Sequence, residues 1–279
     1  MEHERWTMAS KDVPPGLWLI GIGPGDLGHM TERAKSIARG CSKRYLEGYT
    51  AVLPKDQEDL LENEVGSWER LMRPSVEDPG SLLEEARKEA VALLVVGDPM
   101  QATTHIDLEA RCMEEDVGFE VVPGMSATSL AVSLSGLQSY KFGRQVTLPY
   151  PYGDYLATSP LEMIWSNRSN GLHTLVLLDL DPTGMGFDLP TPMSPTQAVS
   201  ILERMAQRVS EEGSGLEMEG DIREWDGILL SDVGTSKQVV SSGTLDEISI
   251  MERGYVHTLI IPSNMSDNER DAFRRRKEP

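Results

Sequence analysis

A short apolar run that ends in a Gly-Asp-Pro turn is the feature that most restricts the fold of this chain. Residues 91–96 are all apolar, and Gly97, Asp98 and Pro99 follow directly. Such a run, ended by glycine and proline, is typical of a buried strand that stops at a tight turn. In open α/β sheets, ligands bind at the carboxyl edge of the strands. The pattern therefore predicts a strand that displays Asp98 at a ligand-binding edge, although an aspartate in a turn is more often a cap.

Strand and helix patterns alternate in the first part of the chain. Strands are expected at 17–20, 43–46, 91–96 and 119–122, and helices at 31–39, 56–64, 81–90 and 105–116. Thr31 and Ser81 are the expected N-caps of two of these helices. This alternation predicts a mainly parallel sheet with helices on both faces.

The pattern beyond residue 123 predicts a second domain. Strands are expected at 146–148, 173–178, 227–231 and 255–261, helices at 126–135 and 194–209, long connections at 149–172 and 180–195, and an acidic surface loop at 210–221. The predicted organisation is a polar extension (1–16), an N-terminal α/β domain (17–123), a C-terminal α/β domain (124–266) and a charged tail without an apolar face (267–279).

Composition and charge disfavour several classes of protein. Hydrophobic residues make up 39% and charged residues 25% of the 279 positions, which is typical of a globular chain. A net charge of −19 disfavours nucleic acid as a partner, because a phosphate backbone would be repelled. No apolar run approaches the ~20 residues of a membrane-spanning helix, and residues 1–16 lack the apolar core of a secretory signal. We therefore expect a cytoplasmic protein with no membrane or nucleic-acid partner.

The glycine-rich loop after the first strand invites comparison with a dinucleotide-binding fingerprint. Gly21 and Gly23 match its first two glycines, but Asp26 stands at the third, and Pro24 lacks the backbone donor that a pyrophosphate would need. A NAD site is therefore disfavoured. The glycines indicate close approach of the backbone to a less anionic ligand.

Other catalytic patterns are weak. No metal-ligand spacing occurs among the histidines, which are His3, His29, His105, His173 and His257. Neither a G-x-S-x-G elbow nor a catalytic setting for Cys41 or Cys112 is present. Asp179 and Asp181 follow a predicted strand and are candidate acid/base groups, although solvated loop acids are more common. We predict no metal, and a cleft that positions substrates for an activated cofactor.

A series of short motifs lies in order between Leu17 and Ser263. They are Gly21-Ile22-Gly23, Tyr45-Leu46-Glu47-Gly48-Tyr49-Thr50, Gly97-Asp98-Pro99, Ala102-Thr103-Thr104-His105, Gly136-Leu137, Tyr140-Lys141-Phe142-Gly143, Tyr150-Pro151-Tyr152-Gly153-Asp154, Thr158-Ser159 and Gly171-Leu172-His173-Thr174-Leu175. In this order they resemble the diphthine synthase family, a branch of the tetrapyrrole methylase-like S-adenosylmethionine-dependent methyltransferases. The first and third motifs belong to the wider group, and the Ala-Thr-Thr-His, Tyr-Lys-Phe-Gly and Gly-Leu-His-Thr-Leu segments point to the branch.

The resemblance implies a fold, a reaction and a set of contacts. The fold would be two α/β domains with mixed sheets and a cofactor cleft between the domains, usually in a homodimer. The reaction would transfer methyl groups from S-adenosylmethionine to the amino nitrogen of a modified histidine, the precursor of diphthamide, on translation elongation factor 2. Carried over by position, the cofactor contacts are Pro24, Asp98, Gln101, Gly124, Met125, Leu178, Val233 and His257. No catalytic residue is assigned. Asp98 is a candidate to attract the cationic donor, and His105 to orient the acceptor.

Two alternatives stay open at this point. Gly-Pro-Gly-Asp at 23–26 and Pro-Gly-Met-Ser-Ala at 123–127 are closer to porphyrin-type members, which leaves the acceptor open. One alternative is C-methylation of a corrinoid or porphyrin precursor. The acidic chain, however, offers little to bind such a polycarboxylate. The other alternative is a non-catalytic module that holds the cofactor or the elongation factor, and these two changes at the cofactor loops are the only sequence features that favour it. The number of methyl groups, esterification of a carboxyl group and the role of residues 1–16 also stay open.

Overall fold

The computed structural model describes residues 13–212 and 220–277, which fold into two compact units. The first unit runs to Ala127 and includes Met185–Pro190, and the second consists of Thr128–Gly184 and the chain from Thr191 onward. Residues 1–12 of the predicted extension and 213–219 of the predicted acidic loop lie outside the described residues.

The first unit is built on a parallel sheet in the strand order β3-β2-β4-β1-β5. Its strands are β1 (Gly16–Gly21), β2 (Lys43–Glu47), β3 (Glu69–Leu71), β4 (Ala90–Val95) and β5 (Phe119–Val122). Its helices are α1 (Glu32–Gly40), α2 (Lys55–Val65), α3 (Arg73–Glu77), α4 (Gly80–Ala86) and α5 (Ile106–Glu114), with a 3-10 turn η2 (Leu27–His29). The predicted parallel α/β arrangement is confirmed.

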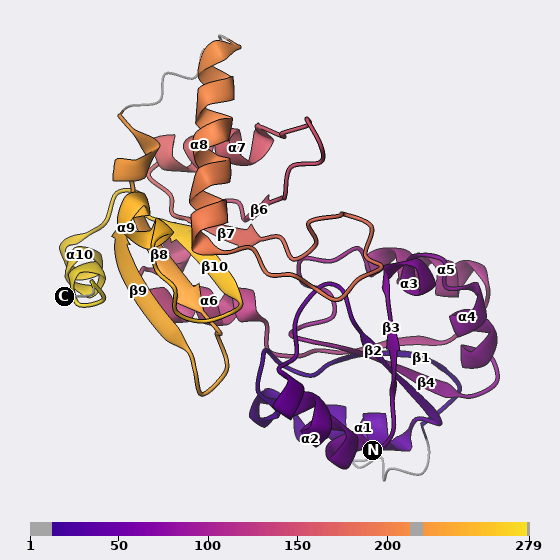
Figure 1. Cartoon of the computed structure of the whole chain (residues 1–279). Helices are drawn as coiled ribbons and strands as arrows, with labels where there is room; N and C mark the ends of the chain where they lie inside the picture. The colour runs from indigo at the N-terminus through magenta and orange to yellow at the C-terminus, as the bar shows by residue number, and fades with distance from the viewer. Residues whose placement is uncertain (1–12, 213–219, 278–279) are drawn as a thin grey trace. The chain divides into compact units, whose positions relative to one another are not determined.

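Helices cover both faces of this sheet, as Figure 1 shows. Trp18 and Ile20 of β1 pack in the cluster that contains α1 and α2. Leu17 and Leu19, which point the opposite way, pack in the cluster that contains α3, α4 and α5. A parallel sheet buried on both sides has strands that are apolar throughout, which explains the run at 91–96.

The second unit is built on a mixed sheet in the order β6-β7-β10-β8-β9, in which only β6 and β7 are parallel. Its strands are β6 (Val146–Leu148), β7 (Thr174–Leu178), β8 (Asp226–Ser231), β9 (Val239–Thr244) and β10 (His257–Ile261). Its helices are α6 (Ala127–Ser135), α7 (Ser159–Ser169), α8 (Pro195–Glu211), α9 (Leu245–Ser249) and α10 (Asp267–Arg274), with 3-10 turns η3 (Ser139–Lys141) and η4 (Ile222–Glu224). The α/β class is thus confirmed, and of the two sheets only this one is mixed.

The two faces of the second sheet also carry separate cores. Val176 and Leu178 of β7 pack with α7, α8 and α9. Leu175 of the same strand packs on the opposite face with Ala131 of α6 and Phe273 of α10.

Several predicted segments were wrong. Residues 149–172 are not one long connection, because α7 forms there through burial of Leu161 and Ile164. Residues 267–279 are not a tail without an apolar face, since α10 buries Ala272 and Phe273. Helix α10 has few apolar residues, and both helices depend on tertiary contacts, which a local pattern does not show.

Smaller differences concern helix and strand boundaries. Ser81 is not an N-cap: α4 begins after Pro79 and ends at Ala86, because the chain must reach β4 at Ala90. Thr31 does cap α1 and accepts a hydrogen bond from the Ala34 backbone at 3.1 Å. The pattern did not predict β3, α3, β9 or α9.

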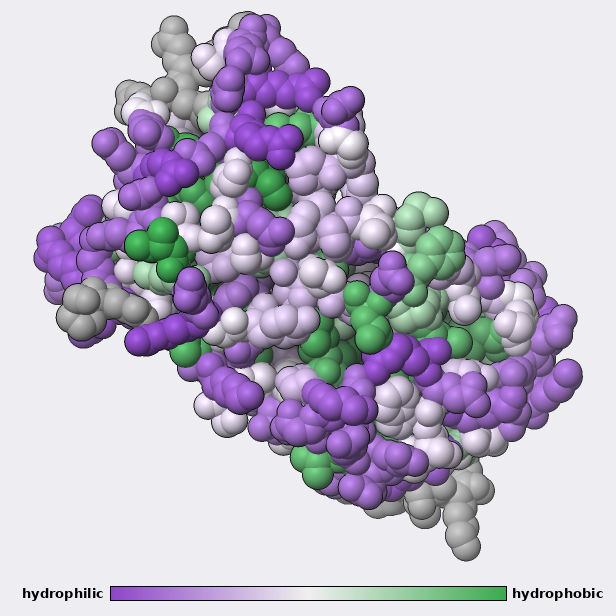
Figure 2. Space-filling view, in the orientation of Figure 1, coloured by the Kyte–Doolittle hydropathy of each residue, from purple (hydrophilic) through white to green (hydrophobic). Residues whose placement is uncertain are grey.

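Hydrophilic side chains cover most of the face seen in Figure 2, as expected for a net charge of −19. Within residues 13–212 and 220–277, no helix is both long and apolar enough to span a bilayer.

Candidate functional site

Loops from neighbouring strands meet at the carboxyl edge of the parallel sheet. Gly23, after β1, and Gly97, after β4, exchange backbone hydrogen bonds of 3.2 and 2.9 Å. The carboxylate of Asp98 accepts one hydrogen bond from the Gly124 backbone at 3.1 Å and another from Met100 at 3.0 Å. The structure therefore brings the predicted residues Asp98 and Gly124 together, next to the loop that contains Pro24.

Glycine is required at two positions of this edge because neighbouring backbone segments leave no room for a Cβ atom. A Cβ atom on Gly21 would lie 2.5 Å from the Gly124 nitrogen and 2.7 Å from the Gly97 oxygen. A Cβ atom on Gly124 would lie 2.8 Å from the Gly21 Cα. The close contact at Gly21 is thus with the neighbouring loops. Close approach of residues 22–26 to a ligand stays a prediction.

The Asp98 carboxylate can serve two roles, one in holding two loops together and one in attracting a cation. One of its hydrogen bonds closes the turn at Met100, and the other joins this turn to the loop after β5. The interpretation of Asp98 as a residue that caps a turn is therefore supported. The side chain is nevertheless half-exposed, and no ion pair involves it among the residues that the structure describes. Gln101 and Met125, also predicted contacts, are exposed. A carboxylate in this state can attract a cation.

The three predicted residues of the second unit share one edge of its sheet. Leu178 ends β7, and Val233 lies two residues beyond the end of β8. Because β10 runs antiparallel to both strands, its first residue, His257, lies at the same edge. His257 Nδ1 is 2.8 Å from the Ser231 hydroxyl, and burial lowers the pKa of His257.

Asp179 and Asp181 are occupied by local turns. Asp179 accepts hydrogen bonds from the backbones of Leu180 at 2.7 Å and Asp181 at 3.1 Å. Asp181 accepts from the Thr183 hydroxyl at 2.6 Å. These contacts favour the interpretation of loop acids over that of an acid/base pair.

A buried glutamate and histidine lie together in the first unit, and the sequence patterns did not pair them. Glu47 ends β2, and His105 directly precedes α5. Their side chains are 0% and 1% exposed, with Glu47 Oε1 3.9 Å from His105 Nε2. Burial raises the pKa of Glu47 to about 7 and lowers the pKa of His105. Both residues stand in family motifs, but their pairing depends on β2 and β4 being neighbours in the sheet.

A pocket of about 720 Å³ lies beside His105, between α3 and α5. Its buried lining is formed by Tyr49, Val76, His105 and Leu108. The rest of the lining is exposed and is formed by Glu77, Thr104, Asp107, Ala110, Arg111 and Glu114. The volume is in the range of small-ligand sites.

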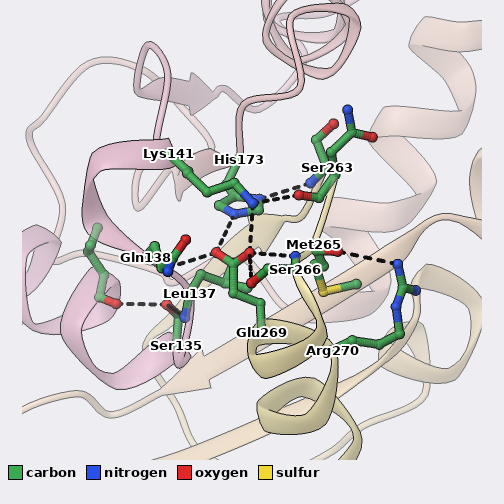
Figure 3. Close-up of polar contacts among 12 residues, drawn as sticks. Ser135, Leu137, Gln138, Lys141, His173, Ser263, Met265, Ser266, Glu269 and Arg270 are labelled. Carbon is green, nitrogen blue, oxygen red and sulfur yellow. Dashed lines mark hydrogen bonds and ion pairs between the residues drawn. The ribbon is translucent and has the colours of Figure 1, made fainter.

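A second buried glutamate–histidine pair lies in the second unit (Figure 3). Glu269 of α10 is 3.1 Å from His173 Nε2 and accepts hydrogen bonds from Lys141 at 2.6 Å and the Gln138 backbone at 2.9 Å. The Ser263 backbone donates to His173 Nδ1 at 3.0 Å, so the ring proton is on Nε2 and is donated to Glu269. Two family motifs, those with Lys141 and His173, thus anchor α10.

A metal site has no support in the described ranges, where no group of three or more His, Cys, Asp or Glu side chains could hold an ion.

Comparison with known proteins gives a consistent result. The sequence profile of the Tetrapyrrole (Corrin/Porphyrin) Methylases matches residues 16–249. The diphthine synthase of Methanoregula boonei is 32% identical over 262 residues, which cover 93% of this chain and 98% of the relative. The diphthine methyl ester synthase of Saccharomyces cerevisiae is 34% identical over 253 residues, which cover 88% of this chain and 83% of the relative.

Solved structures show the same fold. A crystal structure of a diphthine synthase has a TM-score of 0.78 at 24% identity and covers 94% of this chain and 95% of its own. A conserved hypothetical protein of Aeropyrum pernix K1 has a TM-score of 0.80 at 27% identity, with 93% and 88% covered. From the matched profile and the length and identity of these relatives, the chain belongs to the Tetrapyrrole (Corrin/Porphyrin) Methylases and, within them, to the diphthine synthase branch of methyltransferases.

Proposed function

We propose that this enzyme uses S-adenosylmethionine to methylate the amino group of the modified histidine precursor of diphthamide on translation elongation factor 2. The observation that carries the proposal is identity of 32–34% to a diphthine synthase and a diphthine methyl ester synthase over 98% and 83% of their lengths. The relatives' names favour this reaction over C-methylation of a corrinoid or porphyrin. A methyltransferase is also favoured over a non-catalytic module.

The residues at the two sheet edges are candidate cofactor contacts, each group in its own unit. On the first unit these are Pro24, Asp98, Gln101, Gly124 and Met125, and on the second Leu178, Val233 and His257. The half-exposed Asp98 carboxylate, which has no cationic partner in the described chain, fits a sulfonium cation. When bound, the cofactor supplies an activated methyl group, so the protein mainly has to align donor and acceptor.

The reaction is tested with labelled S-adenosylmethionine and elongation factor 2 that carries the unmethylated precursor. Label in the factor supports the proposal, whereas label only in a tetrapyrrole, or binding without transfer, contradicts it. Mass spectrometry of the modified peptide counts the methyl groups. Mild alkali releases a methyl ester but not an N-methyl group, which separates the activities named for the archaeal and yeast relatives.

Asp98→Ala tests the cofactor site. We expect calorimetry to show S-adenosylmethionine binding weakened by about tenfold or more, because a charge-assisted contact is worth about 1.4 kcal/mol or more. Asp59→Ala is the control, since it removes an exposed carboxylate from α2. Equal affinity of the two variants would exclude Asp98 from the site.

We also propose a cytoplasmic homodimer that acts on the elongation factor, in line with the resemblance. Light scattering of the purified full chain measures the oligomeric state, and a monomeric mass would contradict the dimer.

A further inference from the structure

Unpaired buried polar atoms gather in one part of the first unit. In the described part of the chain, the buried side-chain atoms without a hydrogen-bond partner are Glu47 Oε1, Arg73 Nε, Thr103 Oγ1, His105 Nε2 and Trp225 Nε1. The first four come from segments at the carboxyl ends of β2, β3 and β4, which are neighbours in the sheet. Each such atom costs about 1–3 kcal/mol, so their gathering calls for a physical reason.

The proton positions in the Glu47–His105 pair follow from its neighbours. His105 Nδ1 lies 2.7 Å from the Pro99 carbonyl oxygen, which can only accept, so Nδ1 carries the proton. His105 Nε2 therefore presents its lone pair to Glu47 Oε1 at 3.9 Å, too far for a hydrogen bond. Two acceptors face each other, and one added proton on either atom would replace the repulsion between their lone pairs with an attraction. The pair is built to take up a single proton.

The groups around the pair favour Glu47 as the place where that proton rests. Burial raises the pKa of Glu47 to about 7, against the opposing effects of the Thr50 hydrogen bonds, the Tyr49 backbone and the Arg73 charge. Burial lowers the pKa of His105, and the Pro99 hydrogen bond only partly offsets this. A base that titrates near the working pH is the most effective in proton transfer.

The pocket between α3 and α5 borders the pair on the side of His105. His105 and Tyr49 form part of its buried wall, and Glu47 lies behind them at the end of β2. Glu77, Asp107 and Glu114 outnumber the one basic group, Arg111, around the pocket. This charge favours a cationic ligand, and the volume of about 720 Å³ admits an amino-acid side chain.

We propose that this pocket receives the cationic acceptor side chain and that the Glu47–His105 pair takes the proton which the acceptor amine must lose before methyl transfer. This inference rests on the proposed function. The N–H bond of the ammonium breaks, its electron pair stays on nitrogen, and the proton enters the gap between His105 Nε2 and Glu47 Oε1. The free amine then forms a bond to the sulfonium methyl carbon, and the electron pair of the C–S bond goes to sulfur. His105 forms part of the pocket wall and turns Nε2 toward Glu47, and Glu47 behind it holds the proton.

The test measures kcat/KM against pH for the full-length enzyme with unmethylated elongation factor 2. The wild type should gain activity with an apparent pKa near 7. Glu47→Gln and His105→Gln should lose about 100-fold at pH 7, and the loss should shrink at high pH, where solvent deprotonates the amine. Both should bind S-adenosylmethionine as the wild type does. His173→Gln is the matched control, because it alters a buried pair outside the pocket and should keep the pH profile.

A second variant tests the pocket without touching the pair. Asp107→Lys combined with Glu114→Lys reverses two exposed charges and should raise KM for the factor by about tenfold while kcat stays within twofold. Wild-type enzyme that binds the donor but does not methylate the factor would overturn the proposed function. Active wild type together with a Glu47→Gln variant that is equally active, or equally impaired at every pH, would overturn this inference alone.

Discussion

The two buried glutamate–histidine pairs have the same side chains and opposite surroundings. Around Glu269 both carboxylate oxygens accept several hydrogen bonds, and both nitrogens of His173 are occupied. Around Glu47 one oxygen is bound by Thr50, and the other faces a histidine lone pair without a proton between them. The first arrangement stabilises a single charge state, whereas the second leaves room for a change of protonation.

The pKa directions follow from this contrast. Burial alone would raise the pKa of Glu269, but hydrogen bonds from Lys141, Gln138 and Ser266 outweigh it and hold the pKa well below its ordinary 4.5. At Glu47, burial wins, because its hydrogen bonds come from Thr50 and the backbone and not from a paired cation. Satisfied buried charges thus serve the fold, and an unsatisfied one points to function.

The largest expected effect comes from Glu269→Ala. Its removal leaves the Lys141 ammonium, the His173 N–H and two backbone donors without their partner. We expect the free energy of unfolding to fall by about 3–5 kcal/mol at pH 7, measured by urea denaturation. Catalysis per folded molecule should be unchanged. A loss below about 1 kcal/mol would contradict the structural role of Glu269, because α10 would then not depend on this contact.

Glu47→Gln should act in the opposite sense on stability. A glutamate whose folded pKa is raised from 4.5 to about 7 makes the folded state less stable as pH rises through this window. Removing the carboxylate should therefore stabilise the protein by up to about 3 kcal/mol at pH 8 and have little effect at pH 4.5. Paired urea melts at the two pH values measure this. Destabilisation at pH 8 would show that Glu47 is structural, as Glu269 is.

Glu269 has the reverse pH dependence, in a lower pH range. Because its folded pKa is lowered, its contribution to stability is complete above pH 4.5 and is lost as pH falls towards the folded value. His173 adds to this loss on acidification, since burial lowers its pKa from 6.5.

Sequence patterns predicted four strands of the first sheet, all except β3, because each of these four is defined locally. The apolar runs of β1 and β4 and the turn at Asp98 contain their own beginning and end. In contrast, α10 has only Ala272 and Phe273 as buried apolar residues, and its anchor Glu269 is held by residues near 138 and 173. No local pattern contains those contacts.

The residues of the candidate site also differ in how far the sequence could place them. Asp98 could be placed at a sheet edge from the sequence, since the strand before it points to that edge. The partner of Glu47 could not, because His105 lies 58 positions later in the chain and the two meet only through the β2–β4 pairing. The resemblance marked both residues as parts of motifs without showing that they form a pair.

The smallest expected effect, and the sharpest, comes from Thr50→Val. The Thr50 hydroxyl donates to Glu47 Oε2 at 2.7 Å and so stabilises the ionised carboxylate. Without it the pKa of Glu47 should rise further, and the midpoint of the profile of kcat/KM against pH should move up by about one pH unit. Thr50→Ser keeps the donor and should restore the wild-type midpoint. Ser266→Ala removes the corresponding hydroxyl from Glu269 and should leave the midpoint in place, because that pair does not titrate in this range. A midpoint that stays fixed in Thr50→Val would mean that a group other than Glu47 controls the profile.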